Sequence, residues 1–318
     1  MQPEYFLRTK VMRAAVIDLG TNTCNLLIAE TSETGYRILH QSKNLVRLGD
    51  NKIKEGEISE EATQRTIESF LQHKEIINKF QPEKIRVVAT SAVRTAQNKI
   101  GFLETVGNAC GWLIKVISGE KEAELIFDGV MLAFQNLENP SLILDIGGGS
   151  NELILARGNK IIWKESQPTG MARIINQFNL SNPISTDEAD KLRAHFAGFH
   201  EAAIEHCKTW KVETLIGCSG AFDTIADMID GVNPGEKLRK TQEISLDSFY
   251  NVYNRLLQST REERLLMKGM DFVRVDLIVP AVILIEFLIS VNQIKQIIQT
   301  DFALREGVFY ELITHDRI

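Results

Sequence analysis

Two stretches of the chain share one pattern of apolar and polar positions. Residues 14–30 read AAVIDLGTNTCNLLIAE, and residues 141–157 read SLILDIGGGSNELILAR. Each is an apolar run that ends in Asp, a turn built from Gly, Thr, Asn or Ser, and a second apolar run. This order predicts a strand, a tight turn and a strand. Because the runs show little alternation, we expect strands that are buried on both faces.

The two stretches align at an offset of 127 residues. The matched pairs are Asp18 with Asp145, Gly20 with Gly147, Thr23 with Ser150, and Leu26 with Leu153. Similar elements follow each stretch, namely a third strand, an amphipathic helix, and a further strand with a helix behind it. We expect them at 36–47, 59–80 and 84–90 in the first half, and at 160–166, 186–208 and 212–217 in the second.

The repetition predicts two α/β domains in tandem. The first spans residues 1–130, and a helix over about 119–135 joins it to the second, which spans 131–318. A strand at 295–300 and a C-terminal helix at 302–314 complete the second domain. A ligand between two such domains is the default expectation.

The composition is that of an ordinary globular protein of 318 residues, with 44% hydrophobic and 25% charged residues. The net charge of −6 argues against a nucleic-acid coat, so any anion must be bound at a local site. The most apolar run, 275–291, is interrupted by Asp276, Pro280 and Glu286. We therefore expect a buried helix there, no membrane partner, no signal peptide and a cytoplasmic location.

Cysteine and histidine spacing gives no metal or redox motif. The four cysteines include no C-x-x-C pair, which indicates a reducing compartment. His195, His200 and His206 lie close together, but their spacings of five and six do not share a helix face. We expect these three histidines on the surface.

The two glycine-rich turns are the first candidate site. Glycine lets backbone amides approach a phosphate, and Thr21, Asn22, Thr23 and Ser150 add side-chain donors. Asp18 and Asp145 stand at strand ends, where Mg²⁺ would need an oxygen ligand. In the other interpretation the two aspartates only cap turns. For a matched pair we favour phosphate binding.

Three further motifs end a strand and open a helix. In ATSAVRTAQN (89–98), Ser91 can cap a helix with Arg94 in its first turn, which suits an oxyanion. In ISGEKEAELIF (117–127), Ser118 can cap a helix whose early acids are general-base candidates. In IGCSGAFDTIAD (216–227), Ser219 and Gly220 present amides to an anion. Each motif alone is equally compatible with an ordinary helix cap.

Two nucleotide-binding motifs are missing from the sequence. There is no G-x-x-x-x-G-K-[ST], which excludes a P-loop NTPase. GGGSNE opens into a second strand rather than a helix, so the dinucleotide fingerprint is not met.

DLGTNT (18–23) and DIGGGSNE (145–152) resemble the two phosphate motifs of the sugar kinase, heat-shock protein and actin superfamily. With ATSAVRTAQN, ISGEKEAELIFDGV, GCSGAFDTIA and TDFALREGVFYE (300–311), the chain resembles the exopolyphosphatase and guanosine pentaphosphate phosphatase family from about residue 13 onward. The resemblance implies an α/β fold of two tandem actin-like (ribonuclease H-like) domains, with mixed sheets flanked by helices and the active site in the interdomain cleft. It implies polyphosphate or guanosine penta- or tetraphosphate as ligand, and a homodimer.

The resemblance also implies roles for individual residues. Glu122 falls on the family's catalytic glutamate, and Glu152 on an acid that acts on the water or the metal. Asp145, Asp18 and Glu152 would hold Mg²⁺ or Mn²⁺, with no organic cofactor. The phosphate contacts would be Thr21, Asn22, Thr23, Arg94, Gly147, Gly148, Gly149, Ser150, Ser219 and Gly220.

Three positions depart from the family pattern: Glu124 replaces Arg, Asn151 replaces Thr, and Ala221 replaces Thr. Glu124 is expected to make the mouth of the site more acidic. Longer members carry a C-terminal helical domain that extends a polyphosphate channel, and the chain lacks its counterpart.

The resulting hypothesis is in-line water attack on a terminal phosphoryl group, with Glu122 as base and Mg²⁺ offsetting charge. The alternatives are a phosphotransferase of the same superfamily, a non-catalytic sensor of guanosine tetraphosphate or polyphosphate, and an actin-like filament protein.

Overall fold

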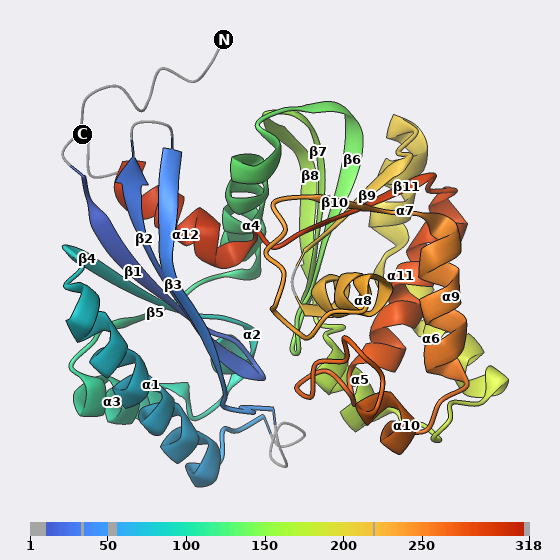
Figure 1. Ribbon diagram of the computed structural model, residues 1–318. Coiled ribbons are helices and arrows are strands. Elements are labelled where there is room, and N and C mark those ends of the chain that lie inside the picture. Colours follow the sequence, from blue (N-terminus) through green and yellow to red (C-terminus); the bar gives the residue numbers. More distant parts are fainter. Residues whose placement is uncertain (1–10, 33–34, 50–55, 219, 315–318) are drawn as a thin grey trace. The chain divides into compact units, whose positions relative to one another are not determined.

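The computed structural model describes residues 11–32, 35–49, 56–218 and 220–314 (Figure 1). The chain divides into two compact units: Met1–Lys121 with Leu304–Ile318, and Glu122–Ala303. Each unit contains one mixed sheet with helices packed on it. The prediction of tandem α/β units is confirmed.

The first unit has a five-stranded sheet in the order β3-β2-β1-β4-β5. β1 pairs antiparallel with β2 and parallel with β4; β2–β3 is antiparallel and β4–β5 parallel. The strands are β1 (Arg13–Leu19), β2 (Thr23–Ser32), β3 (Gly35–Leu45), β4 (Lys84–Ala89) and β5 (Ile114–Val116). The helices are α1 (Glu60–Phe80), α2 (Ser91–Thr95), α3 (Lys99–Cys110) and α12 (Leu304–Thr314).

The second unit repeats this topology in the order β8-β7-β6-β9-β11, with β10 added at the edge. The pairings β8–β7 and β7–β6 are antiparallel, and β6–β9 and β9–β11 are parallel. The strands are β6 (Leu137–Ile146), β7 (Asn151–Gly158), β8 (Lys160–Gln167), β9 (Thr214–Cys218), β10 (Gln242–Ile244) and β11 (Gln296–Thr300). The helices are α5 (Met171–Gln177), α6 (Thr186–Phe199), α7 (Glu201–Trp210), α8 (Gly220–Asp230), α9 (Leu246–Leu257), α10 (Arg261–Leu265) and α11 (Ile278–Asn292).

Helix α4 (Gly119–Phe134) contains the boundary between the units, which falls between Lys121 and Glu122. The predicted boundary lay at residue 130, and the predicted second domain included the C-terminal helix. In the structure α12 packs on β1, β2 and β4, so it belongs to the first unit. Sequence order cannot show which sheet a terminal helix covers.

Burial explains the unbroken apolar runs of the central strands. Residues 14–17 of β1 have no exposed surface, and neither do residues 142–144 of β6. α1 packs on β2 and β3, and its N-cap Ser59 accepts from Ala62 N, as the sequence predicted. In Figure 1, α1 and α12 lie on opposite faces of the first sheet, which accounts for strands that are apolar on both sides.

Helix α11 is the buried helix expected at 275–291. Residues 278–285 are all buried, and the helix packs against α5, α6, α7 and α9. Pro280 lies in its first turn, where a missing amide hydrogen costs little. Within the described parts of the chain, no helix has the length and apolarity required to cross a membrane.

The predicted helix 186–208 is two helices, α6 and α7, which meet at His200. His200 leaves the helical region, with φ −110° and ψ 21°. The expectation that His200 lies on the surface is wrong, because its ring has no exposed surface and faces Glu165 and Thr169. A buried imidazole with polar partners explains the interruption at this position.

Candidate functional site

Turn 1 (residues 20–23) and turn 2 (residues 147–150) are closed by the same backbone hydrogen bond. In each turn the first amide donates to the last carbonyl, at 2.9 Å in turn 1 and 3.0 Å in turn 2. The registers agree as well, since Asp18 lies opposite Asn25 and Asp145 lies opposite Glu152. The repeat seen in the sequence is therefore preserved in the backbone.

The carbonyls of turn 1 accept hydrogen bonds from the segment after β3. Asn22 O accepts from Val46 N at 2.9 Å and from Arg47 N at 3.0 Å. Thr21 O accepts from Gly49 N at 3.3 Å. In a trans peptide the N–H of the next residue points opposite to the carbonyl. The amides of Asn22 and Thr23 therefore point away from the segment after β3.

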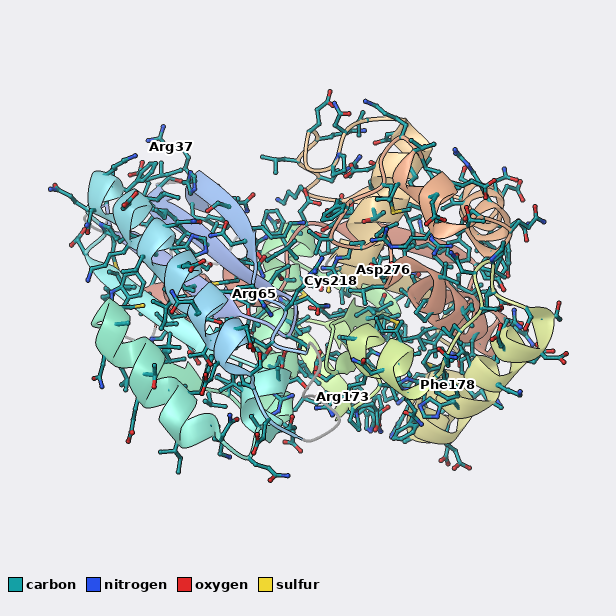
Figure 2. The ribbon with its side chains drawn as sticks, turned by 90° about the horizontal axis from the view of Figure 1, so that it is seen from below. Arg37, Arg65, Arg173, Phe178, Cys218 and Asp276 are labelled. Carbon is teal, nitrogen blue, oxygen red and sulfur yellow. The ribbon has the colours of Figure 1, made fainter. Side chains whose placement is uncertain are left out.

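The carbonyls of turn 2 accept from the start of α5. Met171 N donates to the first turn carbonyl, Gly147 O, at 3.0 Å. Ala172 N donates to the second, Gly148 O, at 2.8 Å. Arg173 Nε donates to the third at 2.8 Å (Figure 2 labels Arg173). By the same planar geometry, three successive amides point away from α5. These amides belong to Gly148, Gly149 and Ser150.

Close packing requires glycine at two positions around turn 2. A Cβ at Gly147 would lie 2.7 Å from Ser150 O. Gly170 is the N-cap of α5, and a Cβ there would lie 2.4 Å from the backbone of Gly149. Sequence reasoning missed Gly170, because it predicted no helix between the strand at 160–166 and the helix at 186–208.

The two turns differ in their acids. Asn25 Nδ2 donates to Asp18 Oδ2 at 3.0 Å, so the facing pair beside turn 1 is one carboxyl and one amide. The facing pair beside turn 2 is two carboxyls, Asp145 and Glu152, which are 7% and 2% exposed. Glu152 Oε1 accepts from the hydroxyls of Ser150 at 2.8 Å and Ser166 at 2.7 Å. These two hydrogen bonds fix the orientation of the Glu152 carboxyl group.

Burial raises the pKa of Asp18 to about 6, and the Glu306 carboxylate raises it further. The hydrogen bond from Asn25 and the charge of Arg305 oppose the rise. Asp18 Oδ1 is buried without a hydrogen-bond partner, and so is Asn22 Nδ2. Turn 1 thus contains one acceptor and one donor that a ligand can satisfy.

Glu122 lies in the second turn of α4 and is 6% exposed. Ser118 Oγ accepts from Lys121 N at 3.1 Å, as expected for the cap of this helix. Arg94 lies in α2, directly after β4, and its Nη1 donates to Ile117 O at 3.0 Å. The N-cap of α2 is Thr90, without a side-chain cap bond, and not Ser91 as predicted.

Helix α8 begins at Gly220, as predicted, and Ser219 lies outside the described residues. The guanidinium of Arg274 rests on this helix start, because a Cβ at Gly220 would lie 2.0 Å from Arg274 Nη2. Arg274 Nε is buried without a hydrogen-bond partner. A cation beside a positive helix end favours an anion at the same place. Sequence reasoning missed Arg274, which no motif singles out.

The carboxyls of turn 2 suit a magnesium ion. No three His, Cys, Asp or Glu side chains form a metal-binding group in the part of the chain that the structure describes. Magnesium does not require such a group, because it is commonly held by one or two carboxylates together with substrate phosphates. Asp145 and Glu152 lie opposite each other on adjacent strands of the second unit. These two residues fit the ion.

Glu124, the residue expected to make the mouth of the site more acidic, forms an ion pair with Lys164. Glu124 Oε1 lies 2.6 Å from Lys164 Nζ. The lysine on β8 offsets the charge of the glutamate, so the effect of Glu124 on the site stays a prediction. Ala221 is buried in α8, where a hydroxyl would need a partner.

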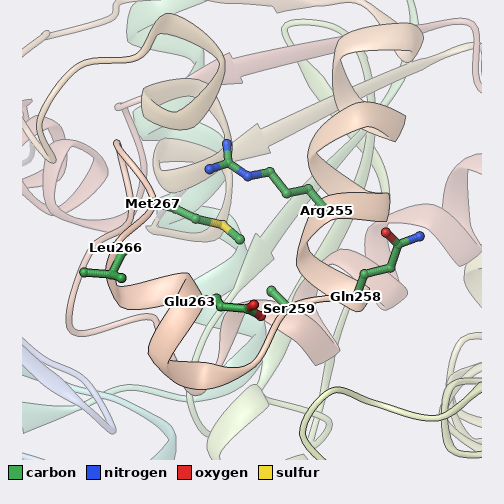
Figure 3. Close-up of a pocket in the computed structure, with 6 residues that line it drawn as sticks. All are labelled: Arg255, Gln258, Ser259, Glu263, Leu266 and Met267. Carbon is green, nitrogen blue, oxygen red and sulfur yellow. The ribbon is translucent and has the colours of Figure 1, made fainter.

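A cavity of about 390 Å³ lies on the second unit beside α9 and α10 (Figure 3). Its lining residues are Arg255, Gln258, Ser259, Glu263, Leu266 and Met267. Glu263 is already engaged in the capping box of α10, and Ser259 Oγ donates to Leu256 O. None of the predicted site residues lines this cavity.

Comparison with solved structures gives a close match over nearly the whole chain. The crystal structure of an exopolyphosphatase from Cytophaga hutchinsonii matches with a TM-score of 0.91 and 34% identity, over 96% of this chain and 98% of that one. A family member from Aquifex aeolicus matches in fold, with a TM-score of 0.82.

Curated relatives agree. Exopolyphosphatase 2 of Mycobacterium tuberculosis is 27% identical over 86% of this chain and 89% of its own length. Guanosine-5'-triphosphate,3'-diphosphate pyrophosphatase of Photobacterium profundum is 28% identical over 95% of this chain and 60% of its own length. The family model described as the Ppx/GppA phosphatase family matches residues 27–316. The chain therefore belongs to the Ppx/GppA phosphatase family.

Proposed function

We propose that this protein is a phosphohydrolase that releases terminal orthophosphate from inorganic polyphosphate, from guanosine pentaphosphate, or from both. The observation that carries the proposal is turn 2. Its hairpin combines three outward amides with two buried carboxyls on facing strands. Amides bind phosphate oxygens, and carboxylates orient water or a metal ion.

The turn 2 amides, with Ser150 and the turn 1 donors, would bind the oxygens of the terminal phosphoryl group. Arg94 would add a fixed positive charge. An acidic protein with a net charge of −6 can bind a polyanion this way, because the donors are concentrated at the turns.

Glu122 would take a proton from the attacking water. The water oxygen forms a bond to phosphorus, and the bridging phosphorus–oxygen bond opposite it breaks. The electron pair leaves with the shortened polyphosphate or nucleotide. Glu152, held by Ser150 and Ser166, would orient the attacking water.

Asp145, with Asp18 or Glu152, would hold Mg²⁺. The bound ion would offset charge on the phosphoryl oxygens. Neutralising these acids one at a time should raise the Mg²⁺ concentration that half-saturates phosphate release.

Arg274 and the start of α8 would bind a second anionic group of the substrate, away from the phosphorus that reacts. A guanidinium whose Nε is buried without a hydrogen-bond partner, beside a helix N-terminus, is suited to a phosphate. Arg274→Gln should therefore raise KM more than it lowers kcat.

The test is phosphate release by the purified protein with Mg²⁺, comparing short polyphosphate, long polyphosphate and guanosine pentaphosphate. Glu122→Gln should lower kcat by about 10²–10⁴-fold while substrate binding is retained. Glu120→Gln is the matched control, because Glu120 is exposed on the same helix.

Two outcomes would contradict the proposal. Phosphate that appears on an acceptor molecule instead of in solution would identify a phosphotransferase. Binding of these substrates without release would identify a sensor.

A further inference from the structure

Four buried or largely buried polar side chains form a chain of contacts behind turn 2. Asn151, Thr169 and His200 have no exposed surface, and the Glu165 side chain is 14% exposed. Polar groups in such surroundings cost free energy unless they are paired. The proposed mechanism uses none of these four residues.

The Asn151 amide fixes the direction of the first two hydrogen bonds. Asn151 Nδ2 can only donate, and it donates to Thr169 O at 2.7 Å and Thr169 Oγ1 at 3.0 Å. Thr169 Oγ1 lies 3.4 Å from His200 Nε2, and the imidazole tautomer decides which of the two donates. In the tautomer that accepts at Nε2, the imidazole proton is on Nδ1 and faces Glu165.

His200 Nδ1 faces Glu165 Oε1 at 3.6 Å. Both atoms are buried without a hydrogen-bond partner, so each is the polar group nearest to hand for the other. Gln167 Nε2 donates to the second oxygen, Glu165 Oε2, at 3.0 Å. The contacts therefore link the Asn151 amide to the Glu165 carboxylate through Thr169 and His200.

Two members of this series, Asn151 and Thr169, lie directly beside turn 2 and its support. Asn151 follows the turn directly, as the first residue of β7. Thr169 precedes Gly170, the N-cap of α5, whose Cα packs against the turn backbone. The next three residues of α5 bond the turn carbonyls. A shift of Thr169 would therefore move the support of the turn.

The first unit has a histidine at the matching place. His73 lies 127 positions before His200, the same offset that relates the two turns. It is also fully buried, and its Nε2 lies 3.2 Å from Cys24 O. Cys24 is the counterpart of Asn151 at this offset. A buried histidine linked to the residue after the turn thus occurs in both units.

We infer that His200 is a positioning residue: through Thr169 and Asn151 it fixes turn 2 and the start of α5, so that the turn amides stay aligned for a phosphoryl group. His73 has the corresponding role at turn 1, through the carbonyl of Cys24. The benefit to phosphate binding rests on the proposed function. The alignment of the turn does not.

The experiment compares His200→Ala, His200→Gln and Thr169→Val with wild type. Glutamine can accept from Thr169 and donate to Glu165, so it should rescue the alanine defect. Thr169→Val keeps the side-chain shape and removes only the hydroxyl. His206→Ala is the control, because His206 stacks on Trp163 and does not contact this series.

Two readouts are measured on the full-length protein: amide hydrogen exchange of segments 145–153 and 168–174, and KM and kcat for tripolyphosphate with Mg²⁺. We expect His200→Ala and Thr169→Val to speed exchange in these segments and to raise KM about tenfold, with a smaller change in kcat. His200→Gln should lie near wild type.

The inference is overturned if exchange in 145–153 is the same in His200→Ala and His206→Ala, or if glutamine rescues nothing. If exchange responds as expected but wild type releases no phosphate, the proposed function fails and the positioning role of His200 stands.

Discussion

Turn 1 and turn 2 have the same backbone and different chemistry. Both close with the same hydrogen bond, and both turn their carbonyls toward a supporting segment. The support is a loop after β3 in one case and helix α5 in the other. Beside turn 2 two carboxyls face each other across the paired strands, whereas beside turn 1 Asn25 stands where turn 2 has Glu152. The backbone geometry is what the repeat has kept, and the acids are what distinguish the two copies.

This difference suggests a division of roles. At turn 1 a single carboxyl, Asp18, has a raised pKa and accepts from the Asn25 amide, which suits the binding of a ligand. Two carboxyls that face each other, one of them oriented by two hydroxyl donors, suit the handling of water and metal.

The largest expected effect comes from removing one acid of turn 2. Glu152→Gln should lower kcat for phosphate release by about 100-fold or more, because the group that orients water or metal loses its charge. Asn25→Ala at the matching position of turn 1 should change kcat by less than about tenfold. Steady-state kinetics with short polyphosphate and Mg²⁺ measure both. Equal losses in the two variants would show that the turns do not divide the roles.

The next effect is on the support of turn 2. Gly170→Ala places a Cβ about 2.4 Å from the turn backbone, so the helix or the turn must shift. We expect a loss of about 1–3 kcal/mol in the free energy of unfolding and a higher KM. Denaturant unfolding measures the loss. Gly198→Ala is the control, because a Cβ there meets nothing within 4 Å. If both variants unfold alike, the contact between α5 and turn 2 is not tight.

The smallest effect concerns the acid of turn 1 and depends on pH. The folded-state pKa of Asp18, about 6, exceeds its ordinary value of 3.8, so folding favours the protonated form. Below about pH 4 the carboxyl is protonated in both the folded and the unfolded state, so it costs no stability. Between about pH 4 and 6 the unfolded state loses the proton while the folded state keeps it, so the free energy of unfolding falls as pH rises. Above about pH 6 both states are deprotonated and the loss is complete. Asp18→Asn should therefore stabilise the protein by on the order of 2 kcal/mol at pH 7.5 and by little at pH 4.

Thermal unfolding of wild type and Asp18→Asn across this pH range measures the difference. A stabilisation that does not change with pH would mean that burial of the carboxylate is not its cause.

The sequence was sufficient to predict the duplicated strand–turn–strand units, because burial on both faces and turn chemistry leave local patterns. It also located Asp18, Asp145, Glu152 and Ser150, whose positions follow from strand register. It did not identify Gly170 or Arg274, because each acts through a contact with a residue distant in the chain. His200 was misassigned for a related reason: its partners come from β8 and the loop after it.

The assignment of α12 has a consequence for synthesis of the protein. This helix covers one face of the first sheet, and its Phe309 is fully buried. During translation the first sheet is synthesised before the second unit, but residues 304–314 that cover it are synthesised after the whole of that unit. The second unit is continuous in sequence, so it can complete its core while the first still exposes an apolar face. The unit whose sheet is synthesised first is therefore expected to complete its core second.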